Sequence, residues 1–317
     1  MDMAGQPTGD FPLVRQPSPC GYGKASWEVN LGCNYACKHC YLGLKVNSGM
    51  PLPDKLRCLD MMVEAGVLWL RITGGEPTID KDFLRSYRHA FELGMMLTVS
   101  TNGSLLWREN ILRLFEECPP YRVTVSMYRA TKTSYDELTQ RSDAWDLFVQ
   151  GMNAARHARL PLRMSVIVTE DNAHEETAMT DLCERWGVEH EVYTNMTPTI
   201  YGGGKVLTAQ SKNHLRMRKQ FTGCSAGHTF FPMDPHGLVS ICKIGRDDQI
   251  SLPQEGIGGL ARLGAITDRL MLRTGGCSGY ALSGSCTVCR PLAKHSGGEG
   301  PAGGSLPART KESRVNT

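Results

Sequence analysis

Residues 27–40 read WEVNLGCNYACKHC, a short apolar run that leads directly into three cysteines. The run at 27–31 is a strand candidate, and Cys33, Cys37 and Cys40 follow it in the spacing C-x3-C-x2-C. Thiols so close in the chain cannot each reach a separate distant partner, but together they can bind one metal centre. In α/β folds the chemistry lies at the carboxyl ends of the strands, so this stretch predicts a metal-binding loop on such a fold.

The alternation of apolar runs and amphipathic stretches continues to about residue 194. Five more strand candidates lie at 67–72, 95–100, 122–126, 162–168 and 188–194. Helix candidates separate them near 53–65, 80–93, 106–117, 143–158 and 173–186. Repeated strand–helix units predict a parallel sheet with right-handed crossovers. Six strands are too few for a closed eight-stranded barrel, so we expect an α/β fold, a partial (β/α)6 TIM-like barrel with an open side.

Shifts in composition divide the chain into four expected parts. Residues 1–24 are rich in proline and glycine and predict an extended N-terminal arm, followed by the barrel core at 25–204. The alternation stops there, so residues 205–295 are expected to form a small, irregular, cysteine-rich domain. Residues 296–317 are glycine-rich and of low complexity, which predicts a disordered tail.

Charge and hydropathy exclude several classes of protein. The chain has 317 residues, of which 41% are hydrophobic and 21% charged, and its net charge is only +3. This charge is too small to indicate a nucleic-acid partner. The N-terminus has no signal-peptide pattern, and apolar runs such as residues 67–70 are far shorter than the roughly 20 residues that span a bilayer. We therefore expect a soluble, cytoplasmic protein without a membrane partner.

Twelve cysteines are unusual for such a chain. In a reducing compartment, clustered thiols bind metal or carry out redox chemistry more often than they form disulfides. Cys33, Cys37 and Cys40 can bind three irons of one cubane, which leaves the fourth iron open to a substrate. A zinc site without its fourth ligand, or three unliganded loop thiols, would have the same spacing.

Two further motifs follow the next two strands. GGEP at 74–77 ends the second strand and STNG at 100–103 ends the third, so both lie on the rim that carries the cysteine loop. Glycines let the backbone approach a ligand closely, while Glu76 and Asn102 supply polar recognition. Each motif alone is only a turn. Their order on successive strand ends, after the three cysteines, is what makes the pattern specific.

This combination resembles the radical S-adenosylmethionine (radical SAM) superfamily over about residues 25–200. The resemblance implies a [4Fe–4S] cluster on Cys33, Cys37 and Cys40 whose open iron binds SAM. It further implies an enzyme in which an electron from the cluster cleaves SAM to methionine and a 5′-deoxyadenosyl radical, which abstracts hydrogen from the substrate. The three cysteines are thus the expected catalytic residues.

The resemblance also assigns a SAM pocket residue by residue. His39 takes the place of the family's aromatic residue near the adenine, and Ser100, Asn102 and Ser126 are expected near the ribose or the methionine carboxylate. The methionine amino group is expected at Gly74, Gly75, Glu76 and Pro77. A Gly75→Val change is therefore expected to weaken SAM binding without unfolding the barrel.

A second group of cysteines lies in the C-terminal third. Cys224 and Cys242 are followed by Cys286 and Cys289, which makes four ligands for a closed second cluster, although a zinc ribbon uses the same ligand set. The pattern resembles the auxiliary-cluster extension called SPASM or its shorter form, Twitch. No cysteine follows Cys289, so one auxiliary [4Fe–4S] cluster is expected.

The remaining cysteines have weaker assignments. Cys277 is a spare thiol or a substitute ligand, and His295 stands where a longer SPASM domain would have its next cysteine. Three others fall in or beside helix candidates and are expected to pack in the core, namely Cys58, Cys118 and Cys183. Cys20 has no assignable role.

Families with this extension modify ribosomally made peptides, sulfatases, nucleotides and aminocyclitols. We predict a maturase that crosslinks, epimerises or oxidises a precursor peptide and receives electrons from a flavodoxin or ferredoxin. Because residues 1–24 leave no room for a peptide-recognition domain, a separate recognition protein is expected. The alternative is a dehydrogenase or epimerase of a small sugar, aminocyclitol or nucleoside. An iron–sulfur carrier or sensor would leave the motifs at 74–77 and 100–103 without purpose.

Overall fold

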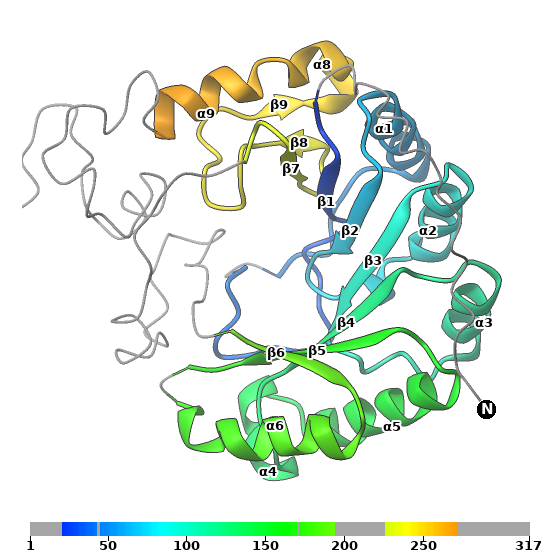
Figure 1. The fold of residues 1–317 in the computed structure, drawn as a ribbon, viewed down its shortest axis with the longest axis vertical. Coiled ribbons are helices and arrows are strands. Elements are labelled where there is room, and N and C mark those ends of the chain that lie inside the picture. The colour runs from blue at the N-terminus through cyan, green and yellow to red at the C-terminus, as the bar shows by residue number, and fades with distance from the viewer. Residues whose placement is uncertain (1–20, 43–44, 170, 194–225, 272–317) are drawn as a thin grey trace, which may run out of the picture.

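The computed structural model describes residues 21–42, 45–169, 171–193 and 226–271, and it has the expected α/β architecture. Six strands pair in parallel and in chain order, with their helices on the convex side of a curved sheet (Figure 1). The six strands are β1 (Lys24–Glu28), β2 (Trp69–Thr73), β3 (Met96–Thr101), β4 (Arg122–Met127), β5 (Leu162–Ile167) and β6 (Glu189–Tyr193).

The helices between these strands lie where the sequence predicts them, to within a few residues. They are α1 (Leu52–Glu64), α2 (Phe83–Glu92), α3 (Glu109–Glu117), α5 (Ala144–His157) and α6 (Glu176–Arg185), with short 3-10 turns at η1 (Pro77–Ile79) and η2 (Ala173–Glu175). One helix was not expected, α4 (Lys132–Thr139). It begins at Thr131, whose side chain accepts a hydrogen bond from the Ser134 amide. Its largely polar sequence hid it from a search for apolar periodicity.

The two faces of the sheet differ in character. Leu70, Ile72 and Val99 are buried in the core shared with the helices. Because side chains alternate along a strand, Thr73 and Ser100 point to the opposite, concave face. The polar ends of the strands therefore meet on the concave side.

The described part of the cysteine-rich region differs from the expectation of irregular structure. Here β7 (Phe230–Met233) pairs in parallel with β1, and β8 (Leu238–Val239) and β9 (Ile250–Ser251) extend the sheet antiparallel. The helices α8 (Leu252–Leu260) and α9 (Leu263–Met271) follow. The strands are only two to four residues long, too short to show a period of two, so local pattern could not reveal them.

The described strands form one open sheet with β6 and β9 at its edges (Figure 1). Within the described ranges, no helix is both long and apolar enough to cross a membrane. Several predictions from sequence fall outside the described residues, namely those for the arm at 1–20, the tail at 296–317, Cys20, Cys224, Cys277, Cys286, Cys289 and His295. Cys58, Cys118 and Cys183 are buried in the core, as expected.

Candidate active site

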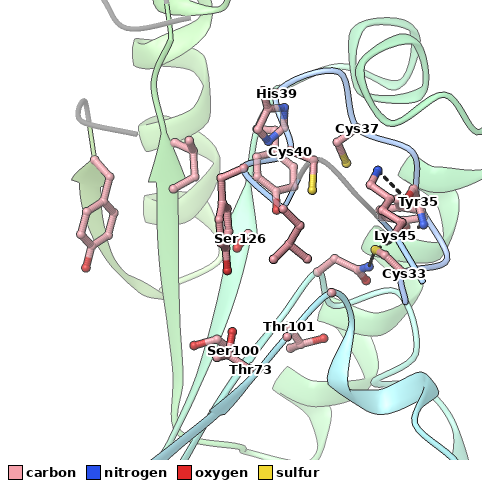
Figure 2. A pocket seen from close by; sticks show the side chains of 18 residues that line it. Cys33, Tyr35, Cys37, His39, Cys40, Lys45, Thr73, Ser100, Thr101 and Ser126 are labelled. Carbon is pink, nitrogen blue, oxygen red and sulfur yellow. Dashed lines mark hydrogen bonds between the residues drawn. The ribbon is translucent and has the colours of Figure 1, made fainter. Parts of the chain in front are cut away.

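A cavity of about 270 Å³ lies at the carboxyl edge of the sheet, where the cysteine loop meets the ends of the strands (Figure 2). The sequence-predicted residues that line it are Cys33, Cys37, His39, Cys40, Gly74, Gly75, Ser100, Asn102 and Ser126. The sequence therefore predicted the position of the cavity. Several of these residues also support the cysteine loop or the strand ends, which their motifs did not indicate.

The three thiols of the loop are partly buried and form no disulfide. They share the cavity, yet no three His, Cys, Asp or Glu side chains in the described ranges converge closely enough to hold a single metal ion. Thiolates on one zinc ion would lie about 4 Å apart. An iron–sulfur cubane instead spreads its cysteines over separate irons. Three thiols around one cavity are the donor set that such a cluster uses.

The electrostatics of the loop favour neutral thiols when no metal is bound. Burial raises the pKa of Cys33 to about 11, with the Glu76 charge adding to the effect. Burial also raises the pKa of Cys37 to about 12. The nearby Lys45 ammonium acts in the opposite direction on both thiols. Because thiolates are the form that binds metal, metal binding here must release protons.

Gly74 and Gly75 pack directly against the chain that leads into the cysteine loop. The Gly75 amide donates to the Asn30 carbonyl at 3.0 Å, and the Glu76 amide donates to the Gly32 carbonyl at 2.8 Å. A Cβ on Gly75 would lie 1.9 Å from the Gly32 carbonyl oxygen. The expectation that Gly75→Val leaves the fold intact therefore conflicts with the structure, because the clash is with backbone that cannot move aside.

Glu76 lies beneath the cavity rather than in its lining. Its side chain is fully buried, and its carboxylate accepts hydrogen bonds from the Asn102 amide at 2.7 Å and the Thr101 hydroxyl at 2.8 Å. It also accepts from the amide and hydroxyl of Thr78. With these donors the carboxylate ties the end of β2 to the end of β3. Pro77, also buried, begins the η1 turn and does not line the cavity.

Asn102 joins the end of β3 to the cysteine loop. Its Nδ2 donates to Asn34 Oδ1 at 2.9 Å and lies 3.9 Å from Cys33 Sγ, while its Oδ1 accepts from the Ser104 amide at 2.9 Å. Asn34 Nδ2 in turn donates to the Ser104 hydroxyl at 2.8 Å. The Asn102 side chain thus holds Cys33 in place in addition to lining the cavity.

His39 forms an aromatic wall of the cavity together with Tyr128. Their ring centroids are 4.4 Å apart with planes tilted by 53°. Burial lowers the pKa of His39 to about 4, with the charges of Lys45 and Arg129 adding to the effect, so the imidazole is neutral at physiological pH. A neutral, buried ring beside a tyrosine is suited to packing against a planar, apolar group.

Half of the lining was not predicted from the sequence. The additional residues are Tyr35, Tyr41, Leu42, Lys45, Thr73, Thr101, Tyr128, Ile167 and Tyr193. Thr73, Ile167 and Tyr193 are the last residues of β2, β5 and β6. The rule that ligands bind at the carboxyl ends of parallel strands could have identified these three. Tyr35, Tyr41, Leu42 and Lys45 flank the cysteines, and their sequence has no signal that separates lining from support.

A buried ion pair network joins the Cys242 segment to this site. Glu28, at the end of β1, is fully buried, and its carboxylate lies 3.4 Å from Lys243 Nζ and 3.0 Å from Arg246 Nη2. Although burial acts to raise it, the two cationic neighbours hold the pKa of Glu28 below its usual value. Lys243 Nζ also donates to the Tyr41 hydroxyl at 2.8 Å. Cys242 is therefore adjacent in the chain to Lys243, whose side chain contacts Tyr41 in the cavity lining.

Comparison with known proteins identifies a family whose model matches about half of the chain. Residues 27–183 match the family model described as the Radical SAM superfamily. A relative named AdoMet-dependent heme synthase, from Nitratidesulfovibrio vulgaris, is 24% identical over 87% of this chain and 76% of its own length. The mycofactocin maturase MftC of Mycobacterium tuberculosis is 27% identical over 70% of this chain and 65% of its own length.

Among solved structures, SuiB of Streptococcus suis has the same fold. The structure bound to the precursor peptide SuiA gives a TM-score of 0.64 at 15% identity, over 77% of this chain and 65% of that one. The structure bound to S-adenosylmethionine also gives 0.64, at 16% identity, over 84% of this chain and 72% of that one. These likenesses extend past residue 183 and establish the α/β architecture.

Proposed function

This protein belongs to the radical SAM superfamily through residues 27–183, and we propose that it is a peptide maturase acting on a ribosomal precursor peptide. Members of this family use a [4Fe–4S] cluster and SAM. Three thiols in one cavity, which Ser100 and Ser126 of the strands also line, are the observation that carries the enzymatic part of this proposal. The substrate class in this proposal is based on the relative that is named as a maturase.

Cys33, Cys37 and Cys40 would hold the cluster. The three thiols line one cavity, which is the donor set of such a group, and Asn102 and Tyr35 fix the first thiol by contacts to its sulfur. When bound, the cluster supplies the electron that cleaves SAM to methionine and a hydrogen-abstracting 5′-deoxyadenosyl radical. The Lys45 ammonium offsets part of the negative charge that three thiolates bring into a buried site.

The remaining lining would bind SAM. His39 and Tyr128 offer aromatic ring surface to the adenine, and the hydroxyls of Ser100 and Ser126 offer hydrogen bonds to the ribose or carboxylate. The backbone of Gly74 and Gly75 faces the cavity and is available to the methionine amino group. Glu76 acts on this pocket indirectly, through the strand ends that it ties together.

An auxiliary [4Fe–4S] cluster on Cys224, Cys242, Cys286 and Cys289 is part of the proposal. The Cys242 thiol is partly buried and forms no disulfide, and its segment is anchored beside the cavity by the Glu28 network. An electron acceptor near the substrate would permit net two-electron oxidation. Cys242 is adjacent in the chain to Lys243, whose side chain contacts Tyr41 in the cavity lining, and this favours a role for the proposed cluster close to the reaction.

The decisive experiment uses anaerobically reconstituted full-length protein with SAM, dithionite and the short peptides encoded beside its gene. We expect 5′-deoxyadenosine to form and the mass of one peptide to change, for example by loss of two hydrogens. Deuterium at the modified carbon should appear in 5′-deoxyadenosine. Formation of 5′-deoxyadenosine that no peptide stimulates, in a system where a small molecule does, would overturn the peptide assignment.

The second candidate substrate is a small molecule. The relative named as a heme synthase covers 87% of this chain, which favours a small-molecule reaction alongside the sugar, aminocyclitol and nucleoside substrates expected from sequence. The same assay separates the two classes, because each predicts which added compound stimulates SAM cleavage and becomes labelled.

A further inference from the structure

The concave face of the sheet carries charges where a closed barrel would pack apolar side chains. Strand register places Ser26, Arg71 and Thr98 side by side on this face of β1, β2 and β3. The same register places Arg163 of β5 beside Glu189 of β6. Such a surface is suited to a polar ligand and not to a sealed core.

Most charges on this face are paired with one another. Arg163 contacts Glu191 through Nη2, and its Nε lies 3.5 Å from a Glu189 oxygen. Arg122 lies 3.8 Å from the other Glu189 oxygen. The Tyr193 hydroxyl donates to Glu191 at 2.6 Å. On β4, β5 and β6 the cations Arg122 and Arg163 thus form ion pairs with the carboxylates Glu189 and Glu191.

Arg71 differs from these residues. Its neighbours in the strand, Leu70 and Ile72, are buried toward the helices, so its exposed side chain lies over the concave face. In the part of the chain that the structure describes, Arg71 has no carboxylate partner. Strand register places it between Ser26 of β1 and Thr98 of β3, and two residues before Thr73 on the same face of β2.

Arg71 is also close to the cavity. It precedes Thr73, which lines the cavity, by two residues, a separation of about 7 Å along a strand. Tyr193 lines the same cavity from the opposite side. A ligand that extends from the cavity onto the concave face would pass between these two side chains.

We propose that Arg71 is a specificity-determining residue that binds a carboxylate of the substrate, so that the precursor peptide presents an Asp or Glu side chain next to the modified residue. A guanidinium binds a carboxylate through two parallel hydrogen bonds and orients it as well as attracting it. On β4, β5 and β6 the cations Arg122 and Arg163 already pair with Glu189 and Glu191, whereas Arg71 keeps its charge available to a carboxylate of the substrate. This inference rests on the proposed peptide function and names the chemistry that the peptide must carry.

The test uses a random peptide library selected on the reconstituted full-length protein with SAM. Wild-type protein should enrich peptides that contain Asp or Glu. The enrichment should fall about tenfold or more in Arg71→Gln, the range expected for one charged hydrogen-bonded pair, and should persist in Arg71→Lys. Arg85→Gln, at an exposed position on α2, is the matched control and should behave as the wild type does. Acidic enrichment that is unchanged in Arg71→Gln would overturn the proposal.

A second measurement separates failure of this inference from failure of the peptide function. Butanedione modification, mapped by peptide mass, should be slower at Arg71 in the presence of glutarate and unchanged at Arg85. Equal modification rates with and without glutarate would refute the anion site. Protection by inorganic phosphate but not by glutarate would refute the carboxylate assignment. If no variant retains any peptide while glutarate still protects Arg71, the anion site stands and the peptide-maturase function falls.

Discussion

The carboxyl edge of β1–β3 and the concave face of β4–β6 belong to one sheet but are held by opposite means. At the edge, glycine backbone packs against glycine backbone, and the buried Glu76 directs its hydrogen bonds to neighbouring loops. On the concave face, long side chains pair in partly exposed ion pairs, with Glu189 60% and Glu191 43% exposed. The first arrangement cannot adjust, whereas the second can rearrange at small cost.

The difference matches what each region is proposed to bind. A cluster and SAM have one shape, so residues that fix the thiols and the glycine loop within a narrow geometry suit them. A substrate differs from one enzyme to the next, and exposed charged side chains can be exchanged without disturbing the fold. The predictions below test whether the edge is rigid and essential while the concave face is tolerant.

The largest effect is expected from removing the metal ligands at the edge. A Cys33/Cys37/Cys40→Ala triple variant should form no 5′-deoxyadenosine from SAM and dithionite. Its iron content should fall from about eight to about four atoms per chain, because the proposed auxiliary cluster keeps all its ligands. Iron analysis and anaerobic chromatography measure the two quantities. Robust SAM cleavage by the triple variant would refute the active-site assignment, and zinc in place of the remaining iron would refute the auxiliary cluster.

A single methyl group at the edge should have the next largest effect. Gly75→Ala would place a Cβ 1.9 Å from the Gly32 carbonyl oxygen, so we expect a loss of about 2 kcal/mol or more in the free energy of unfolding. Chemical denaturation of the metal-free protein measures it. Gly258→Ala is the control, because no atom lies within 4 Å of a Cβ there and the residue is in helix α8. Equal stability of the two variants would show that the edge tolerates movement.

Replacing the buried carboxylate of Glu28 should lower the free energy of unfolding somewhat less than Gly75→Ala does, because Lys243 and Arg246 keep some access to water. Glu28→Gln leaves Lys243 and Arg246 without their common partner, and we expect a loss of about 2 kcal/mol at neutral pH. The pKa of Glu28 is held below its unfolded value of 4.5, so its stabilisation is present above that pH and is lost as the pH falls through the lowered value.

The pH dependence supplies the check on Glu28. The difference in unfolding free energy between wild type and Glu28→Gln should shrink between about pH 6 and about pH 3. Glu109→Gln, whose carboxyl group is 90% exposed, should show little difference at either pH. A difference for Glu28→Gln that is constant over this range would mean that the ion pairs contribute nothing to stability.

The smallest effect is expected on the concave face. Arg163→Gln removes ion pairs to Glu189 and Glu191, but these partners are largely exposed, so the free energy of unfolding should change by less than about 1 kcal/mol. Denaturant titration measures this change. A loss comparable to that of Gly75→Ala would erase the contrast between the two regions.

Much of this molecule could be predicted because the relevant signals are local. Strands β2 to β5 carry consecutive or alternating apolar residues, and each motif at 33–40, 74–77 and 100–103 lies at or shortly after the end of a strand. Hydrophobic periodicity and the rule that strand ends carry the chemistry were enough to bring these motifs to one edge. The α/β class, the open sheet and half of the cavity lining follow from sequence in this way.

The tertiary structure decided what each of those residues does. Only the fold shows that Gly75 packs on Gly32, that Glu76 is buried below the cavity, and that β7 joins β1 after two hundred residues of intervening chain. Likewise Thr73 at the end of β2 and Tyr193 at the end of β6 line one cavity because the sheet curves, which no pattern within β2 or β6 reveals. Periodicity reports only on neighbours along the chain, whereas clashes, buried carboxylates and unpaired charges are set by residues that the sequence keeps far apart.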